Sequence, residues 1–371
     1  MHSDWHGTLF FYLKPICLYK ANRIIALRIC VNLCLSMPRN SRRIKTDFKK
    51  IDMELRFLGN SDVKITPVIM GTWQAGKSGW PGVDDAEITR AIRAAFDEGI
   101  ATFDTAEEYG WGYSEKILGS ALHDVRDQVI FATKVHPKNL EHDQLIKSCH
   151  QSLKNLKTDY LDLYQVHWPS GSWGTKEVPI EETMEAMNEL KRQGKIRAIG
   201  VSNFSVTQLQ EAMKFGQIDS LQSPLSLFWR QVEKEHIPFC IEKDITFLAY
   251  SPLSQGILAG KFQQGHKFAK KDHRKRNRLF QPEHFKRVQR ALKKLEPIAK
   301  RNSMSMSQMA LAWVMAHPHT YPVAGARNIE QAVENAKAVS VNLTPKDLSE
   351  IEVVSLIVTS HLDDNPIIWK I

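Results

Sequence analysis

Four polar side chains stand at or just after the ends of short apolar runs in the sequence. Asp104 closes the run ATF, Lys134 ends the run VIFAT, and His167 follows LDLYQV, while Tyr109 comes five residues after Asp104. If these runs are parallel strands of one closed sheet, their carboxyl ends meet at a single mouth. Each residue alone also fits an ordinary role as a cap, a solvated charge or a core histidine. Their occurrence on three successive strand ends favours a shared site.

Together these residue types can protonate a carbonyl oxygen while a hydride reaches its carbon. A tyrosine is a poor acid at neutral pH, because its unperturbed pKa is about 10. A neighbouring ammonium would lower that pKa, and an aspartate would keep the ammonium charged and aimed. We therefore expect Tyr109 to donate the proton, Lys134 and Asp104 to set its acidity, and His167 to orient the substrate.

The elements that must position these residues alternate along the chain. Apolar runs typical of strands lie at 68–73, 101–104, 128–134, 159–166, 196–201, 220–222, 246–250 and 321–324. Helical periodicity marks the segments 84–98, 113–122, 144–156, 180–192, 206–214, 234–243, 282–301, 306–316 and 329–339. Eight strands, each followed by a helix, predict an α/β fold, the (β/α)8 TIM barrel.

Two additions flank the predicted barrel. Residues 55–58 and 63–65, joined by a turn at Gly59 and Asn60, predict an N-terminal hairpin. Thr344 and Pro345 open an additional C-terminal helix that runs to Val354 and packs outside the barrel. The sequence does not decide where the tail from Thr359 to Ile371 lies, and a position near the barrel mouth is one alternative.

The composition separates an N-terminal extension from the rest. The chain has 371 residues and a formal charge of +9, of which residues 1–52 carry +7, so the predicted barrel at 53–371 is nearly balanced and does not resemble a nucleic-acid-binding body. We interpret residues 1–52 as a disordered tail, a targeting segment for an organelle or a wrongly assigned start. The five cysteines have no metal-ligand spacing, so we predict free thiols, no metal and a cytoplasmic location.

One motif matches a nucleotide-binding pattern but lacks the helix which that pattern requires. The stretch GTWQAGKS (71–78) matches the phosphate-loop pattern of NTPases. That loop requires a helix starting at its Lys-Ser pair, and Gly79, Pro81 and Gly82 prevent one here. We therefore interpret the stretch as a glycine-rich loop after the first strand.

The set FDTAEEYG, FATKV and LDLYQVHWP closely resembles the aldo-keto reductase superfamily. Within it, LKRQGKIRAIGVSNF and AYSPLSQGILAGK resemble the bacterial general-stress and inositol-locus reductases and the β subunits of potassium channels. The resemblance covers about Leu55 to Val354. It implies a (β/α)8 barrel, an Asp, Tyr, Lys, His tetrad and the cofactor NADP(H).

The resemblance also implies a set of cofactor-binding residues. Those matching the nicotinamide site are Ser202, Asn203 and Gln222; those matching the pyrophosphate segment are Tyr250, Ser251, Leu253, Gly256 and Lys261; those matching the adenosine end are Gly325, Arg327, Gln331, Glu334 and Asn335. Arg327 favours NADP over NAD, because a guanidinium suits a phosphate.

One position departs from the family pattern. Many relatives have an aromatic residue three positions after the strand-six glutamine, where this chain has Leu225. Leucine offers no π face to a nicotinamide ring, and Trp229 is a possible substitute. Five other tryptophans, after strands one, two and four, are candidates for an apolar substrate pocket: Trp73, Trp80, Trp111, Trp168 and Trp173.

From these features we predict an NADP-dependent oxidoreductase that reduces aldehydes or ketones to alcohols. The alternative is a nicotinamide-binding regulatory subunit of a membrane protein with weak turnover. We expect a small-molecule carbonyl partner, no nucleic acid and no membrane span, and we interpret the basic run Lys270–Arg278 as a solvated loop with some attraction for cofactor phosphates. The sequence selects neither a particular substrate nor an oligomeric state.

Overall fold

The computed structural model describes residue 51 and residues 53–367. In this part of the chain, parallel strands close into a barrel in the order β10, β3, β4, β5, β6, β7, β8, β9. Their bounds are β3 Ile69–Gly71, β4 Thr102–Asp104, β5 Ile130–Val135, β6 Leu161–Val166, β7 Ile196–Ser202, β8 Ser220–Pro224, β9 Thr246–Tyr250 and β10 Thr320–Gly325. The predicted TIM barrel is confirmed. The predictions for residues 1–50 and 52 lie outside the described residues.

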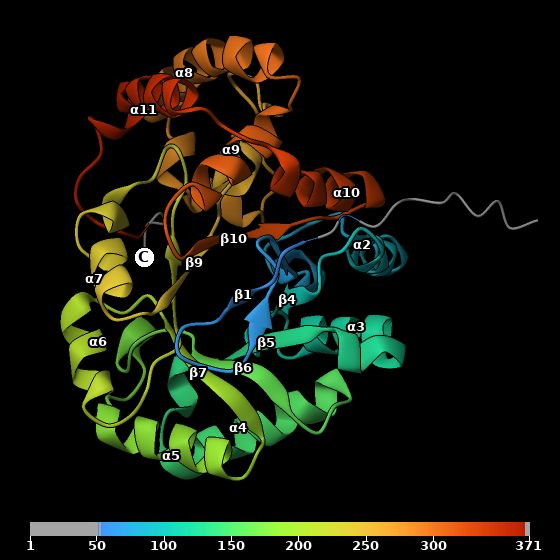
Figure 1. Cartoon of the computed structure of the whole chain (residues 1–371), viewed down its shortest axis with the longest axis vertical. Coiled ribbons are helices and arrows are strands. Elements are labelled where there is room, and N and C mark those ends of the chain that lie inside the picture. The colour runs from blue at the N-terminus through green and yellow to red at the C-terminus, as the bar shows by residue number, and fades with distance from the viewer. Residues whose placement is uncertain (1–50, 52, 368–371) are drawn as a thin grey trace, which may run out of the picture. The chain divides into compact units, whose positions relative to one another are not determined.

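Helices surround the strands as a ring (Figure 1). Those of the ring are α2 Asp85–Asp97, α3 Tyr113–Leu122, α4 His142–Leu156, α5 Ile180–Arg192, α6 Val206–Met213, α7 His236–Glu242, α9 Met306–Met315 and α10 Ile329–Lys337. Their starts follow local rules: the Asp84 carboxylate accepts a hydrogen bond from the Glu87 N–H at the start of α2, and Ser205 forms a capping box at α6. Among the described residues, no helix has both the length and the apolar character needed to cross a bilayer.

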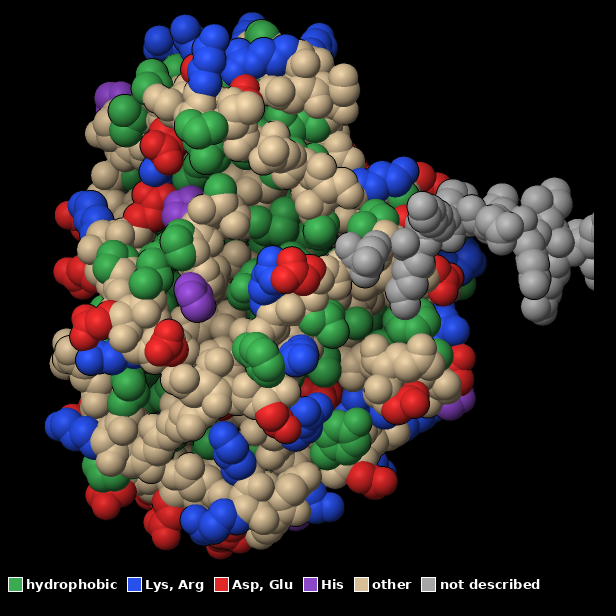
Figure 2. All heavy atoms as spheres, viewed as in Figure 1, with side chains coloured by type: hydrophobic (Ala, Val, Ile, Leu, Met, Phe, Trp, Pro, Cys, Tyr) green, Lys and Arg blue, Asp and Glu red, His purple; other side chains and the backbone are tan. Residues whose placement is uncertain are grey.

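Two further helices, α8 (Pro282–Arg301) and α11 (Pro345–Thr359), pack against each other (Figure 1). Helix α11 continues five residues beyond the predicted end at Val354. The outer face of α8 is basic, and Lys and Arg side chains gather over this helix in Figure 2. Its opposite face is apolar and buried, as expected of an amphipathic surface helix.

An apolar floor fills the amino-terminal half of the barrel. The antiparallel hairpin of β1 (Arg56–Phe57) and β2 (Lys64–Ile65) lies there, as predicted. Leu58, Val63 and Ile65 are buried with inward-facing residues of the strands, such as Leu163 and Leu248. The hairpin therefore closes the end of the barrel opposite the predicted site.

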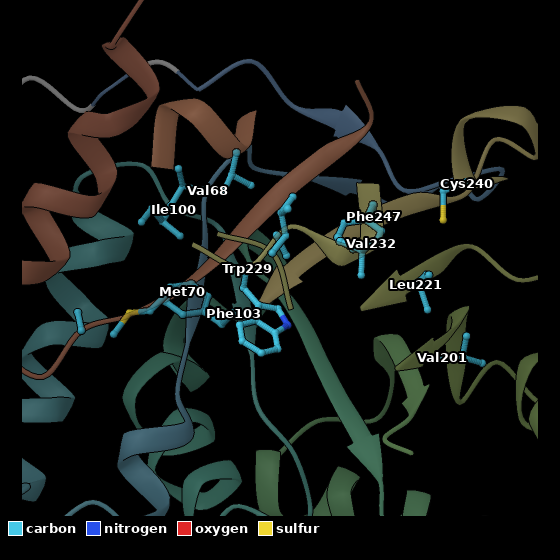
Figure 3. Packing of buried hydrophobic residues seen from close by; sticks show 14 of the residues in the cluster. Val68, Met70, Ile100, Phe103, Val201, Leu221, Trp229, Val232, Cys240 and Phe247 are labelled. Atoms are coloured by element: carbon cyan, nitrogen blue, oxygen red, sulfur yellow. The ribbon is translucent and has the colours of Figure 1, made fainter. Parts of the chain in front are cut away.

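A second apolar layer lies between the strands and the helices. Because strand side chains alternate between two faces, Tyr164 of β6 points outward into this layer while its neighbour Gln165 points into the barrel. Figure 3 shows part of the layer, including Phe103, Phe247 and Trp229. The strands are thus held rigidly from outside, which fixes the residues at their carboxyl ends.

The glycine-rich stretch after β3 does not form a phosphate loop. Residues Trp73–Gly76 make a short 3-10 helix, and Lys77 follows in the left-handed conformation (φ 62°). The Lys77 ammonium lies 2.9 Å from Asp85 Oδ1 at the start of α2. This geometry is consistent with the prediction that the stretch is not an NTPase phosphate loop. The strand predicted at 68–73 is shorter in the structure, because β3 ends at Gly71 and Trp73 already belongs to the 3-10 helix.

The end of the described chain packs back onto the barrel. Pro366 O accepts a hydrogen bond of 2.8 Å from Trp229 Nε1, and the Asp363 carboxylate pairs with Arg278 at 2.6 Å. Residues 365–367 line a hollow together with Asn203 and Trp168, which follow β7 and β6. Up to residue 367, the tail therefore does lie near the barrel mouth.

Candidate active site

The four residues predicted from strand ends meet at the carboxyl end of the barrel. Lys134 Nζ donates to Asp104 Oδ1 at 2.6 Å and to the Thr105 carbonyl at 2.8 Å. Both the Lys134 and Asp104 side chains are buried, so each charge depends on the other for compensation. Tyr109 and His167 lie above this pair, with ring centroids 5.6 Å apart in an edge-to-face arrangement.

The loop after β4 places Tyr109 by close backbone contacts. Gly110 has φ +69°, and a Cβ added there would lie 2.4 Å from the Gly76 carbonyl oxygen. The Tyr109 carbonyl accepts a hydrogen bond of 3.1 Å from the Ser114 N–H in the first turn of α3. Two glycines thus let neighbouring loops touch and hold the tyrosine backbone between them.

One expectation about acidity is wrong for this structure. Lys134 was expected to lower the pKa of Tyr109, but burial raises the pKa of the phenol well above 10.0, and the Asp104 carboxylate raises it further. The reason is geometric, because Lys134 Nζ directs hydrogens to Asp104 and Thr105 and lies 5.1 Å from the centre of the tyrosine ring. The phenol is therefore held in its protonated form.

His167 is held neutral. Burial, with a contribution from the Lys134 ammonium, brings the pKa of its imidazole well below 6.5. Its Nδ1 is buried without a hydrogen-bond partner in the described part of the chain. A neutral ring can still donate one N–H to a ligand, so the orienting role predicted for it is chemically sound.

A long groove runs from this site across the ends of β8, β9, β10 and β3. It encloses about 1190 Å³, counting its open mouth. The predicted residues that line it are Asp104, Tyr109, Gln222, Tyr250, Ser251, Leu253, Gly256, Lys261, Gly325, Arg327, Gln331, Glu334 and Asn335. Of the predicted tetrad, Asp104 and Tyr109 line this groove together with the residues expected at the adenosine end, whereas Lys134 and His167 are not part of its wall.

Ser202 and Asn203 do not line this groove. Asn203 Nδ2 donates to Ser202 Oγ at 3.0 Å and to the His167 carbonyl at 3.1 Å, and Asn203 Oδ1 accepts from the Tyr250 hydroxyl at 2.8 Å. Here Asn203 links the ends of β6, β7 and β9. Its contact with a nicotinamide stays a prediction.

Neither candidate for covering the nicotinamide ring faces the groove. Leu225 and Trp229 are both fully buried. Ser226 and Trp229 exchange backbone hydrogen bonds of 2.9 and 3.0 Å, so the chain turns tightly just after β8 and carries both side chains into the core. Tyr250 at the end of β9 does line the groove.

The five tryptophans occupy different places around the mouth. Trp73 and Trp80 line the groove, with ring centroids 5.1 Å apart, and Trp73 lies 6.1 Å from the Tyr109 ring. Trp168 is buried. Trp111 and Trp173 are 60% and 44% exposed, so they form an outer aromatic rim.

Sequence reasoning did not assign several residues of the groove, and Arg274 is the most informative. It lies in the basic run interpreted as a solvated loop, yet its guanidinium is largely buried, pairs with Asp272 at 2.5 Å and lies 5.3 Å from the centre of the Trp80 ring. The one sign of this in the sequence was Asp272, the single acidic residue within the basic run. Gln74, Gln255 and Phe262 are other unassigned lining residues.

Arg327 has a different charge environment from Arg274. It is half-buried in the groove wall, 5.7 Å from the centre of the Trp80 ring. Among the described residues no carboxylate lies within 4.0 Å of its guanidinium. An unneutralised guanidinium in a groove is suited to an anionic ligand.

A sequence model of the aldo/keto reductase family matches residues 67–355. The aldo-keto reductase YhdN of Bacillus subtilis is 36% identical over 314 residues, which are 81% of this chain and 93% of that protein. The NADH-specific methylglyoxal reductase of Escherichia coli is 32% identical over 312 residues, which are 78% and 94% of the two chains.

Solved structures give the same assignment. The glycerol dehydrogenase AKR11B4 of Gluconobacter oxydans has a TM-score of 0.75 and 31% identity, covering 84% of this chain and 97% of its own. An aldo/keto reductase of Klebsiella pneumoniae in complex with NADP and acetate has a TM-score of 0.66 and 28% identity, covering 85% and 99%.

Proposed function

The chain belongs to the aldo/keto reductase family, and from that membership we propose that it reduces aldehydes or ketones to alcohols with NADPH. The observation that carries the proposal is the position of Tyr109. Its protonated phenol lies at one end of a long groove, beside His167 and above the buried Lys134–Asp104 pair. This is the arrangement that proton delivery to a carbonyl oxygen requires.

Each residue has a distinct task in this proposal. A carbonyl oxygen that accepts a hydrogen bond from the neutral His167 ring would be oriented toward the Tyr109 hydroxyl. The phenol gives up its proton as negative charge develops on that oxygen. Lys134 and Asp104 form the buried ion pair beneath the phenol, with the Lys134 ammonium 5.1 Å from the centre of the tyrosine ring.

The groove residues fit a nicotinamide dinucleotide. Two buried amide atoms on residues that line the groove, Gln74 Oε1 and Gln255 Nε2, have no partner among the described residues and can meet polar groups of a ligand. Lys261 and Arg327 supply positive charge for phosphates. When bound, NADPH supplies the hydride.

The preference for NADPH over NADH rests on Arg327. The relatives differ in their cofactor. The aldo/keto reductase of Klebsiella pneumoniae has a structure with NADP, whereas the methylglyoxal reductase of Escherichia coli is named as NADH-specific. Arg327 has no acidic partner within 4.0 Å among the described residues, so a 2′-phosphate would supply the missing counter-charge. We therefore propose that this protein uses NADPH in preference.

The proton-donor role is tested by Tyr109→Phe. We expect kcat for NADPH-dependent reduction of an aldehyde panel that includes methylglyoxal to fall about a hundredfold or more, with NADPH binding retained. Tyr164→Phe is the matched control, because its hydroxyl is buried on the outer face of β6 without a partner in the described chain. Near wild-type turnover by Tyr109→Phe would refute the assignment.

The cofactor preference is tested by Arg327→Gln. The Kd for NADPH should rise on the order of tenfold or more, because a charge-assisted contact is lost, while the Kd for NADH stays nearly unchanged. Arg327→Lys keeps the charge and should lose less. Equal effects on both cofactors would contradict the phosphate contact.

The alternative, a regulatory subunit with weak turnover, draws no support from the relatives named above, which are reductases or dehydrogenases by name. A broad aldehyde and ketone panel, with glycerol in the oxidative direction, separates the two functions. Turnover comparable to that of typical enzymes favours the reductase.

A further inference from the structure

A buried glutamine, Gln165, contacts the catalytic aspartate but belongs to neither the predicted tetrad nor the predicted cofactor set. Its side chain is fully buried inside the barrel, and its Nε2 donates to Asp104 Oδ2 at 3.3 Å. Gln222 Nε2 donates to the same oxygen at 2.9 Å and lies 3.5 Å from Gln165 Oε1. Two amides therefore share one carboxylate oxygen.

The register of the barrel creates the space for Gln165. On β6 it lies between Lys134 of β5 and Gly200 of β7. A Cβ added at Gly200 would come within 2.9 Å of Gln165 Cγ and 2.3 Å of Ser220 Oγ. The missing side chain at Gly200 thus lets Gln165 reach into the polar layer directly above the apolar floor.

The two amides differ in what else they face. Asp104 Oδ1 is taken by Lys134, so the hydrogen bonds to Oδ2 come from Gln222 and Gln165. Gln222 also lines the groove, whereas Gln165 is not part of its wall. Gln222 can therefore be drawn toward a ligand, while Gln165 stays with the carboxylate.

We propose that Gln165 is a positioning residue that holds Asp104 Oδ2 when Gln222 turns its amide toward a bound nicotinamide. A buried carboxylate oxygen deprived of donors is strongly unfavourable, and without Gln165 the hydrogen bond to Oδ2 would depend on Gln222 alone, so any turn of the Gln222 amide away from Asp104 would leave that oxygen unpaired. Gln165 keeps a donor on Oδ2 in either orientation of Gln222 and so keeps the Asp104–Lys134 pair in one geometry. The inference rests on the proposed function.

The first test is Gln165→Met, which keeps the size of the side chain but removes the donor. We expect the Kd for NADPH, measured by quenching of tryptophan fluorescence, to rise on the order of tenfold, and kcat to fall by a similar factor. Ser220→Ala is the matched control, because Ser220 Oγ lies in the same layer, is buried and has no partner among the described residues. It should leave both quantities unchanged.

The second test is Gln165→Glu, read as a pH profile. An ionised glutamate would repel Asp104, whereas a protonated one can donate to Oδ2 as glutamine does. The ratio of the variant's Kd to the wild-type Kd should therefore fall toward one as the pH is lowered. A residue that only fills space would not produce this dependence.

The outcomes separate the two proposals. A wild-type protein that neither binds nor oxidises NADPH refutes the proposed function itself. Wild-type turnover together with an unchanged Kd and kcat in folded Gln165→Met overturns only the role of Gln165. If Gln165→Met does not fold, a Kd ratio for Gln165→Glu that is independent of pH overturns it.

Discussion

At the scale of single residues, the acidity of Tyr109 differs from the simple expectation in an instructive way. An adjacent ammonium does not guarantee a low pKa for a phenol, because burial disfavours the phenolate and Asp104 adds negative charge. A phenol with a raised pKa is protonated throughout the neutral range but is a weaker acid, so it gives up its proton only to a strong base. The developing alkoxide of a reduced carbonyl is such a base.

The pH profile of reduction follows from these directions. In the proposed mechanism Tyr109 acts in its protonated form and His167 as a neutral donor, and the pKa of the phenol is raised above 10.0 while that of the imidazole is lowered below 6.5. Raising the pH therefore depletes the donor only beyond 10.0, and lowering it protonates His167 only below 6.5. We expect kcat for reduction to be flat between these limits, measured by NADPH oxidation in overlapping buffers.

A titration of kcat centred near 6.5 would contradict the neutral state of His167. Tyr109→Phe, which lacks the ionisable phenol, serves as the control for the alkaline limb.

At the scale of elements, the site depends on two loops that touch through glycines. The loop after β3 and the loop after β4 cross at Gly76 and Gly110, where a Cβ on either residue would lie within 2.5 Å of the other loop's backbone. Tyr109 immediately precedes this crossing. The position of Tyr109 is therefore fixed by backbone packing between the two loops as well as by the strand that precedes it.

Gly110→Ala should disturb both stability and catalysis. The positive φ and the clash with the Gly76 carbonyl together destabilise the fold by about 2 kcal/mol or more, and kcat should fall because Tyr109 moves. Thermal unfolding and kcat are the measurements. Gly194→Ala is the control: it has φ +68° but open space around it, so it carries only the backbone cost and should keep wild-type kcat.

A Gly110→Ala variant that is destabilised no more than Gly194→Ala would show that the loop crossing is not rigid. Full activity despite lower stability would show that Tyr109 is placed by other contacts.

The long segment between β9 and α8 shows where sequence reasoning about elements reached its limit. Asp272 caps the turn at His273 and binds Arg274, and His273 N donates to the Gly79 carbonyl at 3.0 Å. The contact between His273 and Gly79 joins segments almost two hundred positions apart in sequence. No local pattern encodes this long-range contact, so the basic run was interpreted as a solvated loop with some attraction for cofactor phosphates, although Arg274 turns inward.

At the scale of the whole molecule, much of the fold followed from periodicity. Parallel strands covered on both faces appear as short apolar runs, and helix caps such as Asp84 and Thr344 mark boundaries directly. The convergence of Asp104, Lys134 and His167 then follows from barrel closure alone. The burial of Leu225 and Trp229 could not be predicted in this way, because the tight turn after β8 that buries them depends on packing and not on spacing.

The apolar floor of the barrel has a consequence for proton supply. Leu58, Val63 and Ile65 seal the amino-terminal end beneath Lys134 and Asp104 with side chains that can neither accept nor pass a proton. If Tyr109 donates its proton as proposed, these residues offer no route for a replacement within the part of the chain that the structure describes, and the new proton arrives from the solvent at the mouth. Protons, substrate and product would then all pass through the same opening at the mouth of the barrel.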